Sequence, residues 1–309
     1  IDTPPFSENY RGFSRIMLNK FRTSISLRHE RMSLLKTIKV IRVPIPSPTL
    51  WPHTTTNSYL IGNEHESILV DAAYDQQVTR TELDRVIREN QLALPKLIIL
   101  THSHRDHAPG VRQLVDWNSK PAIYCHEEEK NGILAAISPL QELSYLQDLE
   151  AITIADTEIL VMHTPGHTPG HLSLYIPSEE ILISGDNIVA KGTTWIGPPD
   201  GDMADYMTTL KRLKSLKLKK IGPGHGDWVD SPYEHIDFVL NRRNEREKQI
   251  LSLLKEHGPL GPDRLTEMIY KDTIHPSVFP VAAKTTEAHL IKLAKDGMVH
   301  KQDEDYLLK

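Results

Sequence analysis

Three histidines and one aspartate lie within six residues of each other, directly after an apolar run at residues 96–101. They are His102, His104, Asp106 and His107. Neutral imidazole and carboxylate are the ligands that Zn²⁺ accepts when no thiolate is offered. The chain has 16 histidines in 309 residues, so this density is too high for a chance surface loop. It predicts a metal site in a loop at the end of a strand.

Three later segments place a further ligand type just past an apolar run. His167 lies between two Pro-Gly turns in residues 163–171, which fix a tight turn around it. Asp186 follows Ser-Gly, and a carboxylate held there can bridge two cations. His225 lies in the glycine-rich segment 222–227, where the backbone can come close to a site. The signals at Asp186 and His225 are weak alone, but four strand-end loops that each deliver ligands form a strong combination.

Other polar residues near these segments have structural explanations. His163 and His171 are predicted to support their loop rather than bind metal. Cys125 is the only cysteine in these 309 residues, so neither an intramolecular disulfide nor a thiolate metal site can form within them. The neighbour His126 raises the alternative of a Cys–His nucleophile. Adjacent residues on a strand face opposite sides, so Cys125 is predicted to be a core or loop residue.

The ligand segments require a rigid two-layer core, and the apolar patterns supply one. Strands are predicted at residues 36–43, 57–61, 67–71, 96–101, 122–125, 151–154, 158–163, 172–176, 181–184 and 219–221. Helices are predicted at residues 76–90, 110–118 and 202–218. This order of strands and helices indicates an α/β fold with two packed sheets and outer helices, an αββα sandwich.

The chain changes character near residue 231 and becomes helical and highly charged. Helices at 233–257, 263–270 and 281–296, followed by a hairpin over 298–308, give the layout of a small winged helix. The resulting domain prediction is an N-terminal extension at 1–31, a catalytic domain at 32–230 and a winged-helix-like domain at 231–309.

The ligand candidates, in chain order, resemble the metal motif of the metallo-β-lactamase superfamily. The motif is His102-x-His104-x-Asp106-His107, followed by His167, Asp186 and His225. The resemblance covers roughly residues 36–230. An Asp at the bridging position resembles the hydroxyacylglutathione-hydrolase (glyoxalase II) and RNase-type branches, which keep Asp there. Antibiotic-degrading β-lactamases often have Cys at this position. Residues 233–309 resemble the winged helix of the β-lactamase-like protein 2 group, and segments 192–194 and 241–247 strengthen that resemblance.

The resemblance implies two Zn²⁺ ions per chain and a role for each ligand. His102, His104 and His167 would hold the first ion; Asp106, His107 and His225 would hold the second; Asp186 would bridge them. Bound Zn²⁺ lowers the pKa of water from about 15.7 to about 7, which makes a metal-bound hydroxide available at neutral pH. Asp106 is the expected catalytic residue, which orients this water or accepts its proton. Asp71 would orient a ligand imidazole.

The sequence departs from the family motif at one place. The first motif is usually followed by Gly-Gly, whereas residues 108–110 read Ala-Pro-Gly, which removes no ligand. Ser103 stands where a larger residue is common, which leaves the shape of the pocket beside it open. Trp51, His53 and Tyr206 are candidates for lining the substrate pocket, and ordinary packing is the alternative for each.

The charge balance bears on the substrate. The net charge is −5, and residues 231–309 carry 12 Arg and Lys against 13 Asp and Glu. A surface that binds nucleic acid normally carries a basic patch. This charge balance therefore favours a small ester or thioester substrate over a nucleic acid. Cleavage of single-stranded RNA is the alternative, because the β-lactamase-like protein 2 group includes a mitochondrial single-strand endoribonuclease beside fungal acyl-carrier thioesterases. Lys284, Lys292 and Lys295 leave a weak RNA contact open.

Two further questions stay open at this level. A metal-binding scaffold without activity is the third functional class, and the complete ligand set speaks against it. The winged helix could cover the site or pair two subunits as a homodimer. No apolar run approaches the roughly 18 residues that span a membrane, so no membrane partner is expected.

The first 31 residues allow three interpretations. Six Arg and Lys lie in residues 1–31, which suits an upstream extension with Met32 as the natural start, an organelle-type targeting segment, or an ordered decoration. The single cysteine favours a reducing, cytoplasmic compartment. A targeting role for residues 1–31 would instead indicate mitochondria.

Overall fold

The computed structural model describes residues 38–49, 53–271 and 273–309. The predictions for residues 1–31, Met32 and Trp51 therefore lie outside the described residues.

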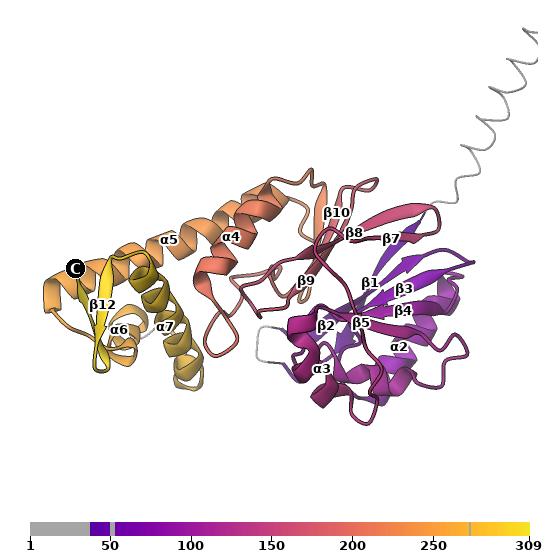
Figure 1. The fold of residues 1–309 in the computed structure, drawn as a ribbon, viewed down its shortest axis with the longest axis horizontal. Helices are drawn as coiled ribbons and strands as arrows, with labels where there is room; N and C mark the ends of the chain where they lie inside the picture. The colour runs from indigo at the N-terminus through magenta and orange to yellow at the C-terminus, as the bar shows by residue number, and fades with distance from the viewer. Residues whose placement is uncertain (1–37, 50–52, 272) are drawn as a thin grey trace, which may run out of the picture. The chain divides into compact units, whose positions relative to one another are not determined.

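The first sheet contains six strands in the order β1-β2-β3-β4-β5-β6, and it is mixed. Figure 1 shows its strands β1 to β5 in indigo to magenta. Its strands are β1 Lys39–Pro46, β2 Thr55–Gly62, β3 Ser67–Val70, β4 Pro95–Ile99, β5 Ala122–Cys125 and β6 Ser144–Tyr145. Strands β1 to β3 pair antiparallel, and β3 to β6 pair parallel. The connection from β3 to β4 runs through helix α2, Gln77–Glu89.

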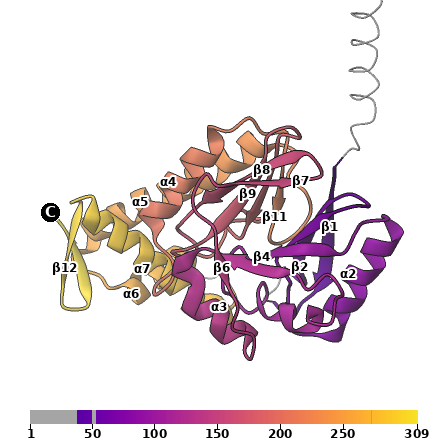
Figure 2. The same cartoon turned by 45° about the vertical axis from the view of Figure 1, so that its right-hand side comes forward.

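The second sheet contains five strands in the order β11-β10-β9-β8-β7. Its strands are β7 Ala151–Ile154, β8 Thr157–His163, β9 Leu172–Ile176, β10 Ile181–Gly185 and β11 Lys220–Pro223. Strands β7 to β10 pair antiparallel, and β10 pairs parallel with β11. Helix α4, Met203–Lys214, precedes β11, and Figure 2 shows it beside this sheet.

The core lies in layers because each buried strand has two covered faces. On β3, Ile68 and Val70 join the cluster between the two sheets, whereas Leu69 points to the opposite side and packs in the cluster that contains Leu83 of α2. This alternation follows from the two-residue period of a strand. The cluster between the sheets also includes Leu174 of β9. Helices therefore cover the outer faces of two packed sheets, which confirms the predicted αββα sandwich.

Local differences from the predicted elements have physical causes. The predicted strand at 36–43 runs on through Pro44 and Pro46 in β1, because an edge strand tolerates a missing N–H donor. The short helix predicted at 110–118 is a 3₁₀ helix, Pro109–Leu114.

One helix was missed by the pattern. Helix α3, Lys130–Ile137, was not predicted; it follows a 3₁₀ turn at Glu127–Glu129. This helix is only eight residues long, contains Gly132 and has no side-chain N-cap, so its local signal is weak.

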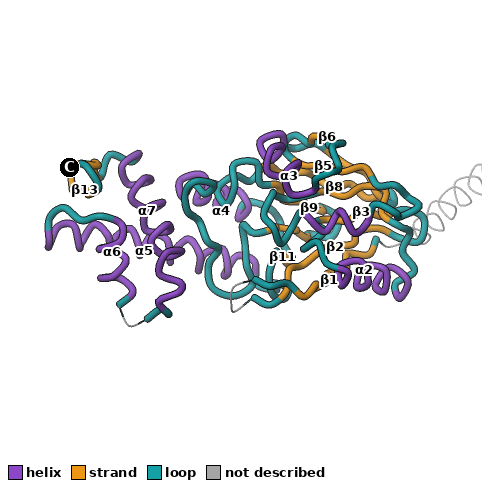
Figure 3. Tube along the Cα trace, turned by 90° about the horizontal axis from the view of Figure 1, so that it is seen from below, coloured by secondary structure: helices purple, strands orange, loops and turns teal. Residues whose placement is uncertain are grey.

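The C-terminal segment has the predicted order of three helices and a hairpin (Figure 3). Its elements are α5 Pro232–His257, α6 Pro262–Tyr270, α7 Phe279–Lys295, β12 Val299–Gln302 and β13 Asp305–Leu308. A short 3₁₀ turn, Pro276–Val278, precedes α7. A cluster of their apolar side chains, including Leu254, Leu265, Leu290 and Tyr306, forms a separate core. These elements match the layout of a winged helix.

Helix α5 is shared by two cores. Ile236 and Val239 in its first half pack with residues of α4 and the second sheet, whereas Ile250 and Leu254 in its second half belong to the winged-helix core. The predicted boundary between residues 230 and 231 lies just before this continuous helix, and it stays a prediction. Among the described residues, no helix combines the length and apolarity that a membrane span requires.

His289 on α7 makes the stability of the winged helix depend on pH. Its imidazole is fully buried beside the Glu247 carboxylate, with Nδ1 and Oε1 3.3 Å apart. Burial lowers the pKa of His289 to about 4, from an ordinary value of 6.5. The unfolded chain therefore takes up this proton first as the pH falls. The contribution of the uncharged His289 to the free energy of unfolding is therefore fully present above pH 6.5. It is lost as the pH falls from 6.5 to 4.

We therefore predict that His289→Gln weakens the pH dependence of unfolding. The difference in unfolding free energy between wild type and variant should shrink as the pH falls from about 6.5 to about 4, because the variant has no imidazole to titrate. Urea denaturation of both proteins, repeated at intervals of pH across this range, measures the difference in unfolding free energy. A difference that stays constant with pH would contradict a buried, uncharged His289.

Candidate metal centre

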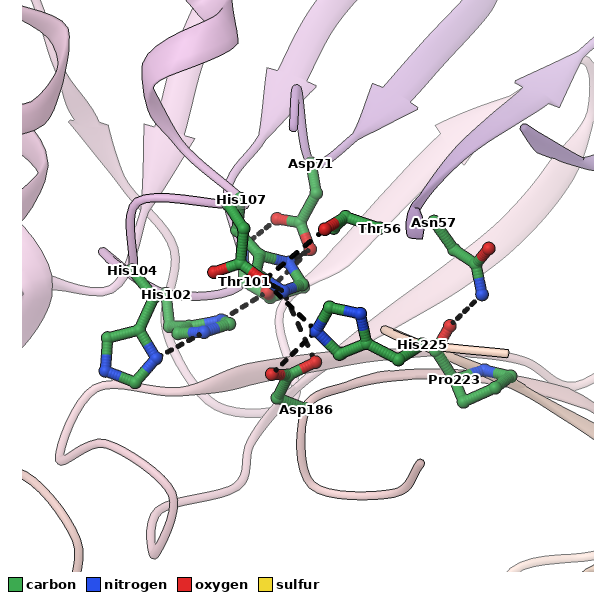
Figure 4. A network of polar contacts seen from close by, with 12 residues as sticks. Thr56, Asn57, Asp71, Thr101, His102, His104, His107, Asp186, Pro223 and His225 are labelled. Atoms are coloured by element: carbon green, nitrogen blue, oxygen red, sulfur yellow. Dashed lines mark hydrogen bonds and ion pairs between the residues drawn. The ribbon is translucent and has the colours of Figure 1, made fainter. Parts of the chain in front are cut away.

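Four loops bring the seven predicted ligand side chains to one end of the sandwich. These loops follow β4, β8, β10 and β11, and each begins where a buried strand ends. Figure 4 shows His102, His104 and His107 from the first loop beside Asp186 and His225 from the second sheet. Segments about 120 residues apart in the chain thus meet because both sheets end at this edge.

Three imidazoles form a first group. His104 Nδ1 lies 3.1 Å from His102 Nε2 and 3.0 Å from His167 Nε2. Two nitrogens bound to one Zn²⁺ at ~2.1 Å with a tetrahedral angle would lie about 3.4 Å apart. The three ring nitrogens therefore converge on a point that a single divalent ion can occupy.

Two imidazoles and two carboxylates form a second group. His225 Nε2 lies 3.1 Å from Asp106 Oδ2 and 3.3 Å from Asp186 Oδ2. His107 Nε2 lies 3.3 Å from Asp186 Oδ1. These four residues offer two nitrogen and two carboxylate ligands within reach of one ion.

Asp186 also reaches the first group. Its Oδ2, which lies 3.3 Å from His225 Nε2, is 3.8 Å from His167 Nε2. A single carboxylate oxygen thus lies between an imidazole of each group. This is the position that a ligand bridging two cations would take.

The buried polar atoms of the second group fit a bound cation. Among the described residues, His107 Nε2 and Asp186 Oδ1 are both buried and face each other at 3.3 Å, without the geometry of a hydrogen bond. Buried polar atoms are costly unless hydrogen bonds or opposite charges compensate for their lost water. A divalent ion between them would satisfy both, and a donor set of nitrogen and oxygen suits zinc as well as other transition metals.

The two groups differ in charge when they hold no ion. In the first group, burial lowers the pKa of His167 to about 4 and that of His102 well below its ordinary range, so the lone pairs of these two rings are free at neutral pH. In the second group, burial opposes a charge on His225, but Asp186 and Asp106 outweigh it and raise its pKa to about 10. Without a metal ion, a protonated imidazole in this group supplies the positive charge between its carboxylates.

Outer contacts fix the orientation of the ligand rings. Asp71 Oδ2 lies 2.7 Å from His107 Nδ1, as expected from the sequence, and both its oxygens accept hydrogen bonds from Thr101. His225 Nδ1 donates to the Thr55 carbonyl, at 2.9 Å. Each bond occupies the nitrogen away from the centre, so that the other nitrogen faces the remaining side chains of its ligand group.

His167 is oriented by a residue that also contacts the winged helix. Its Nδ1 donates to the Trp195 carbonyl at 2.9 Å, and the Trp195 indole N–H donates to the Val281 carbonyl of α7 at 3.2 Å. The Trp195 ring lies 6.5 Å from the His104 ring, between centroids. Neither residue that supports these rings was singled out from the sequence: Trp195 acts through its backbone carbonyl and Thr101 through its N–H and hydroxyl, and no local pattern marks either role.

The structure separates the two remaining histidines of the second segment from the ligand groups. His171 is fully buried, and its Nε2 accepts a hydrogen bond from the Asp186 N–H at 3.2 Å, so it supports the bridging loop. His163 stacks on His126 with ring centroids 4.0 Å apart and planes 5° from parallel. Glu128 lies near this pair, but lone pairs in two parallel, stacked planes cannot meet at one ion.

Predictions for the other singled-out side chains had mixed outcomes. Tyr206 is fully buried and donates to the Asn187 carbonyl at 2.9 Å, so its prediction as a pocket residue was wrong. It lies on the core face of α4, which the sequence pattern alone did not separate from the pocket. His53 lies beside the second group, with its ring 5.2 Å from that of His225. Cys125 is confirmed as a core residue, and burial raises its pKa to about 12.

Comparison with known proteins assigns the family. A model of the metallo-β-lactamase superfamily matches residues 51–225, and a model of the β-lactamase-associated winged helix domain matches residues 262–306. This chain belongs to the metallo-β-lactamase superfamily. A β-lactamase-like protein 2 homolog of Caenorhabditis elegans is 32% identical over 79% of this chain and 80% of its own length. The Drosophila melanogaster homolog is also 32% identical, over 84% of this chain and 89% of its own length.

Solved structures share the whole described fold. A metallo-β-lactamase family protein from Thermus thermophilus is similar over 88% of this chain and 98% of its own length, with a TM-score of 0.71 and 24% identity. A β-lactamase domain protein from Burkholderia ambifaria covers 88% of this chain and 91% of its own, with a TM-score of 0.75 and 19% identity. The chain is therefore a hydrolase of a superfamily that generally uses metal ions, and the two ligand groups are its candidate metal sites.

Metal binding should release protons. His107 and His225 have raised pKa values in the metal-free protein because carboxylates face them, and each must lose its proton to become a ligand. We predict that adding Zn²⁺ near neutral pH releases protons and that metal affinity rises with pH. The dependence of the calorimetric heat on the ionisation enthalpy of the buffer measures the release. Binding of two ions without proton release would contradict this account of the second group.

Proposed function

We propose that this protein is a binuclear zinc hydrolase that cleaves a small ester or thioester. The observation that carries the proposal is the position of Asp186 Oδ2 between His167 of one ligand group and His225 of the other, at 3.8 and 3.3 Å. Two ions at these groups would share the bridging carboxylate. When bound, they would supply Lewis acidity and lower the pKa of a water to about 7.

Metal identity is part of the proposal. The ligand set contains no thiolate, and nitrogen and carboxylate ligands also suit manganese and iron. One protein of similar fold, 27% identical with a TM-score of 0.50 over 62% of this chain and 96% of its own, was solved in a di-iron-bound form. We favour zinc because three imidazole nitrogens that lie within reach of one ion are a common zinc ligand set.

Asp106 is the group best placed to handle a proton. Its side chain is 16% exposed, whereas His107 is fully buried and His225 is 7% exposed. The Thr56 hydroxyl donates to Asp106 Oδ2 at 3.3 Å, which holds the carboxylate in place. Asp106 can therefore contact water from the open side of the second group and orient it or accept its proton.

A cavity next to the first group suits an uncharged chain. It has a volume of about 370 Å³ and lies between the His167 loop, the segment before α4 and helix α7. Its lining includes Pro169, Met203 and Ile291, together with three aspartates, Asp200 among them. Asp200 lies 3.8 Å from His104. The apolar side chains would accept an acyl or thiol group, and the two aspartates outside the Lys295–Asp202 ion pair would repel a phosphodiester backbone.

The lysines of α7 are already paired, which weakens the RNA alternative. Lys284 binds Glu287 at 2.8 Å, Lys295 binds Asp202, and Lys292 binds both Glu247 and Asp296. Binding of nucleic acid draws its affinity from protein cations that displace the counterions of the phosphates, and the carboxylate at each of these lysines offsets its charge.

A relative from Aspergillus fumigatus, 25% identical over 70% of this chain and 65% of its own length, is named an atrochrysone carboxyl ACP thioesterase.

We predict thioester turnover without RNA cleavage. Zinc-loaded protein is offered S-lactoylglutathione, a neutral acyl thioester and a labelled single-stranded RNA under the same conditions. The expected result is thiol release from at least one thioester and an intact RNA, because the cavity and α7 disfavour polyanions. RNA cutting with no thiol release would replace the thioester proposal with the nuclease alternative.

Loss of a ligand should remove both metal and activity. We predict that His102→Ala and Asp186→Ala each lower turnover by at least about 100-fold, beyond the 10–100-fold typical of outer contacts. Bound zinc, measured by atomic emission, should fall with turnover. His300→Ala is the matched control, because His300 lies exposed on β12. Full activity in a metal-depleted His102→Ala protein would contradict a metal mechanism.

A further inference from the structure

Glu129 is a buried carboxylate that neither ligand group uses. Its residue is 3% exposed, whereas its neighbours Glu127 and Glu128 are exposed. Its two oxygens each accept one backbone N–H: Oε2 from Ser103 at 2.9 Å and Oε1 from Gly170 at 3.0 Å. A carboxylate is expensive to bury unless hydrogen bonds replace its water, and these two bonds supply that compensation.

The two donors lie in different ligand loops. Ser103 stands between His102 and His104, and Gly170 follows His167 by three residues. One side chain thus connects the two loops that supply all three imidazoles of the first group. Glu129 is 26 residues from Ser103 and 41 from Gly170 in the chain.

Two glycines allow this close approach. A Cβ on Gly170 would lie 2.9 Å from Glu129 Cγ and from its backbone nitrogen. A Cβ on Gly132, in the first turn of α3, would lie 2.5 Å from Ser103 Oγ. The small Ser103 therefore packs against α3. The sequence had left open the shape of the pocket beside Ser103, and this contact places helix α3 there.

The second ligand group has separate supports. His107 is held by Asp71, His225 by the Thr55 carbonyl and Asp106 by Thr56. None of these contacts involves Glu129 or α3. A change at Glu129 should therefore reach the two groups unequally.

We propose that Glu129 is a positioning residue that sets the distance between the loops of His102, His104 and His167 and so tunes metal affinity at the first group. This proposal rests on the two-metal site of the proposed function. Glu129 makes no contact with the ligand atoms themselves and acts only through the backbone that carries them. The alternative is a purely structural role in which the same bonds stabilise the fold without affecting the metal.

Glu129→Gln separates these roles. The amide keeps the size of the side chain but turns one acceptor into a donor, which then faces a backbone N–H of one ligand loop. Glu128→Gln is the matched control, since Glu128 is the exposed neighbour in the same turn. Gly170→Ala disturbs the same contact from the opposite loop, and it keeps the proposal testable should Glu129→Gln fold poorly.

The experiment titrates each metal-free protein with Co²⁺ and follows the visible absorption, with Zn²⁺ affinities measured by competition with a chromogenic chelator. The wild type and Glu128→Gln should bind two ions. Glu129→Gln and Gly170→Ala should weaken one of them by about 10–100-fold and leave the other unchanged. In a His104→Ala background, which removes a first-group ligand, Glu129→Gln should have no further effect on the remaining ion.

Three outcomes would overturn the proposal. Equal weakening of both ions would show a general loss of structure, and unchanged affinities with lower thermal stability of the metal-free protein would show a structural role alone. In both cases a wild type that binds two ions leaves the proposed function intact. A wild type that binds no Co²⁺ would overturn the two-metal site and this proposal with it.

Discussion

The structure depends on placing the carboxylate of Asp186 between two groups of buried imidazoles. Charge at this position is stable only when opposite charge or hydrogen-bond donors surround it, because burial removes its water. Without a cation, protonated His107 and His225 supply that opposite charge. The backbone around it must also be compact: a Cβ at Gly224 would overlap Asp186 Oδ1, so only glycine lets β11 and β10 end so close together.

Rigid strands make this charge placement reproducible. Each ligand loop begins at the end of a strand whose side chains lie in the packed cores, so the loop ends are fixed before any ligand is positioned. Outer contacts then fix each ring: Asp71 for His107, Trp195 for His167 and Thr55 for His225. Apolar burial away from the ligand groups therefore contributes to the free energy that holds these loops in place.

The winged helix belongs to the site as well as to its own core. Helix α5 packs in both cores, and α7 accepts the Trp195 indole N–H and lines the cavity beside the first ligand group. The three lysines of α7 are paired with carboxylates. A domain with the layout of many nucleic-acid-binding domains here forms one wall of the cavity beside the first ligand group.

The sequence by itself determined the ligand types, their order and their positions after strands, because these features depend on short-range spacing and on apolar periodicity. It also determined the sandwich, the winged-helix layout and the absence of thiolate ligands within the chain. Only the tertiary structure decided that Glu129 joins two ligand loops, that Trp195 orients His167 and that Tyr206 is buried. These outcomes rest on contacts between residues tens of positions apart, and no local pattern records which backbone group a distant side chain will meet.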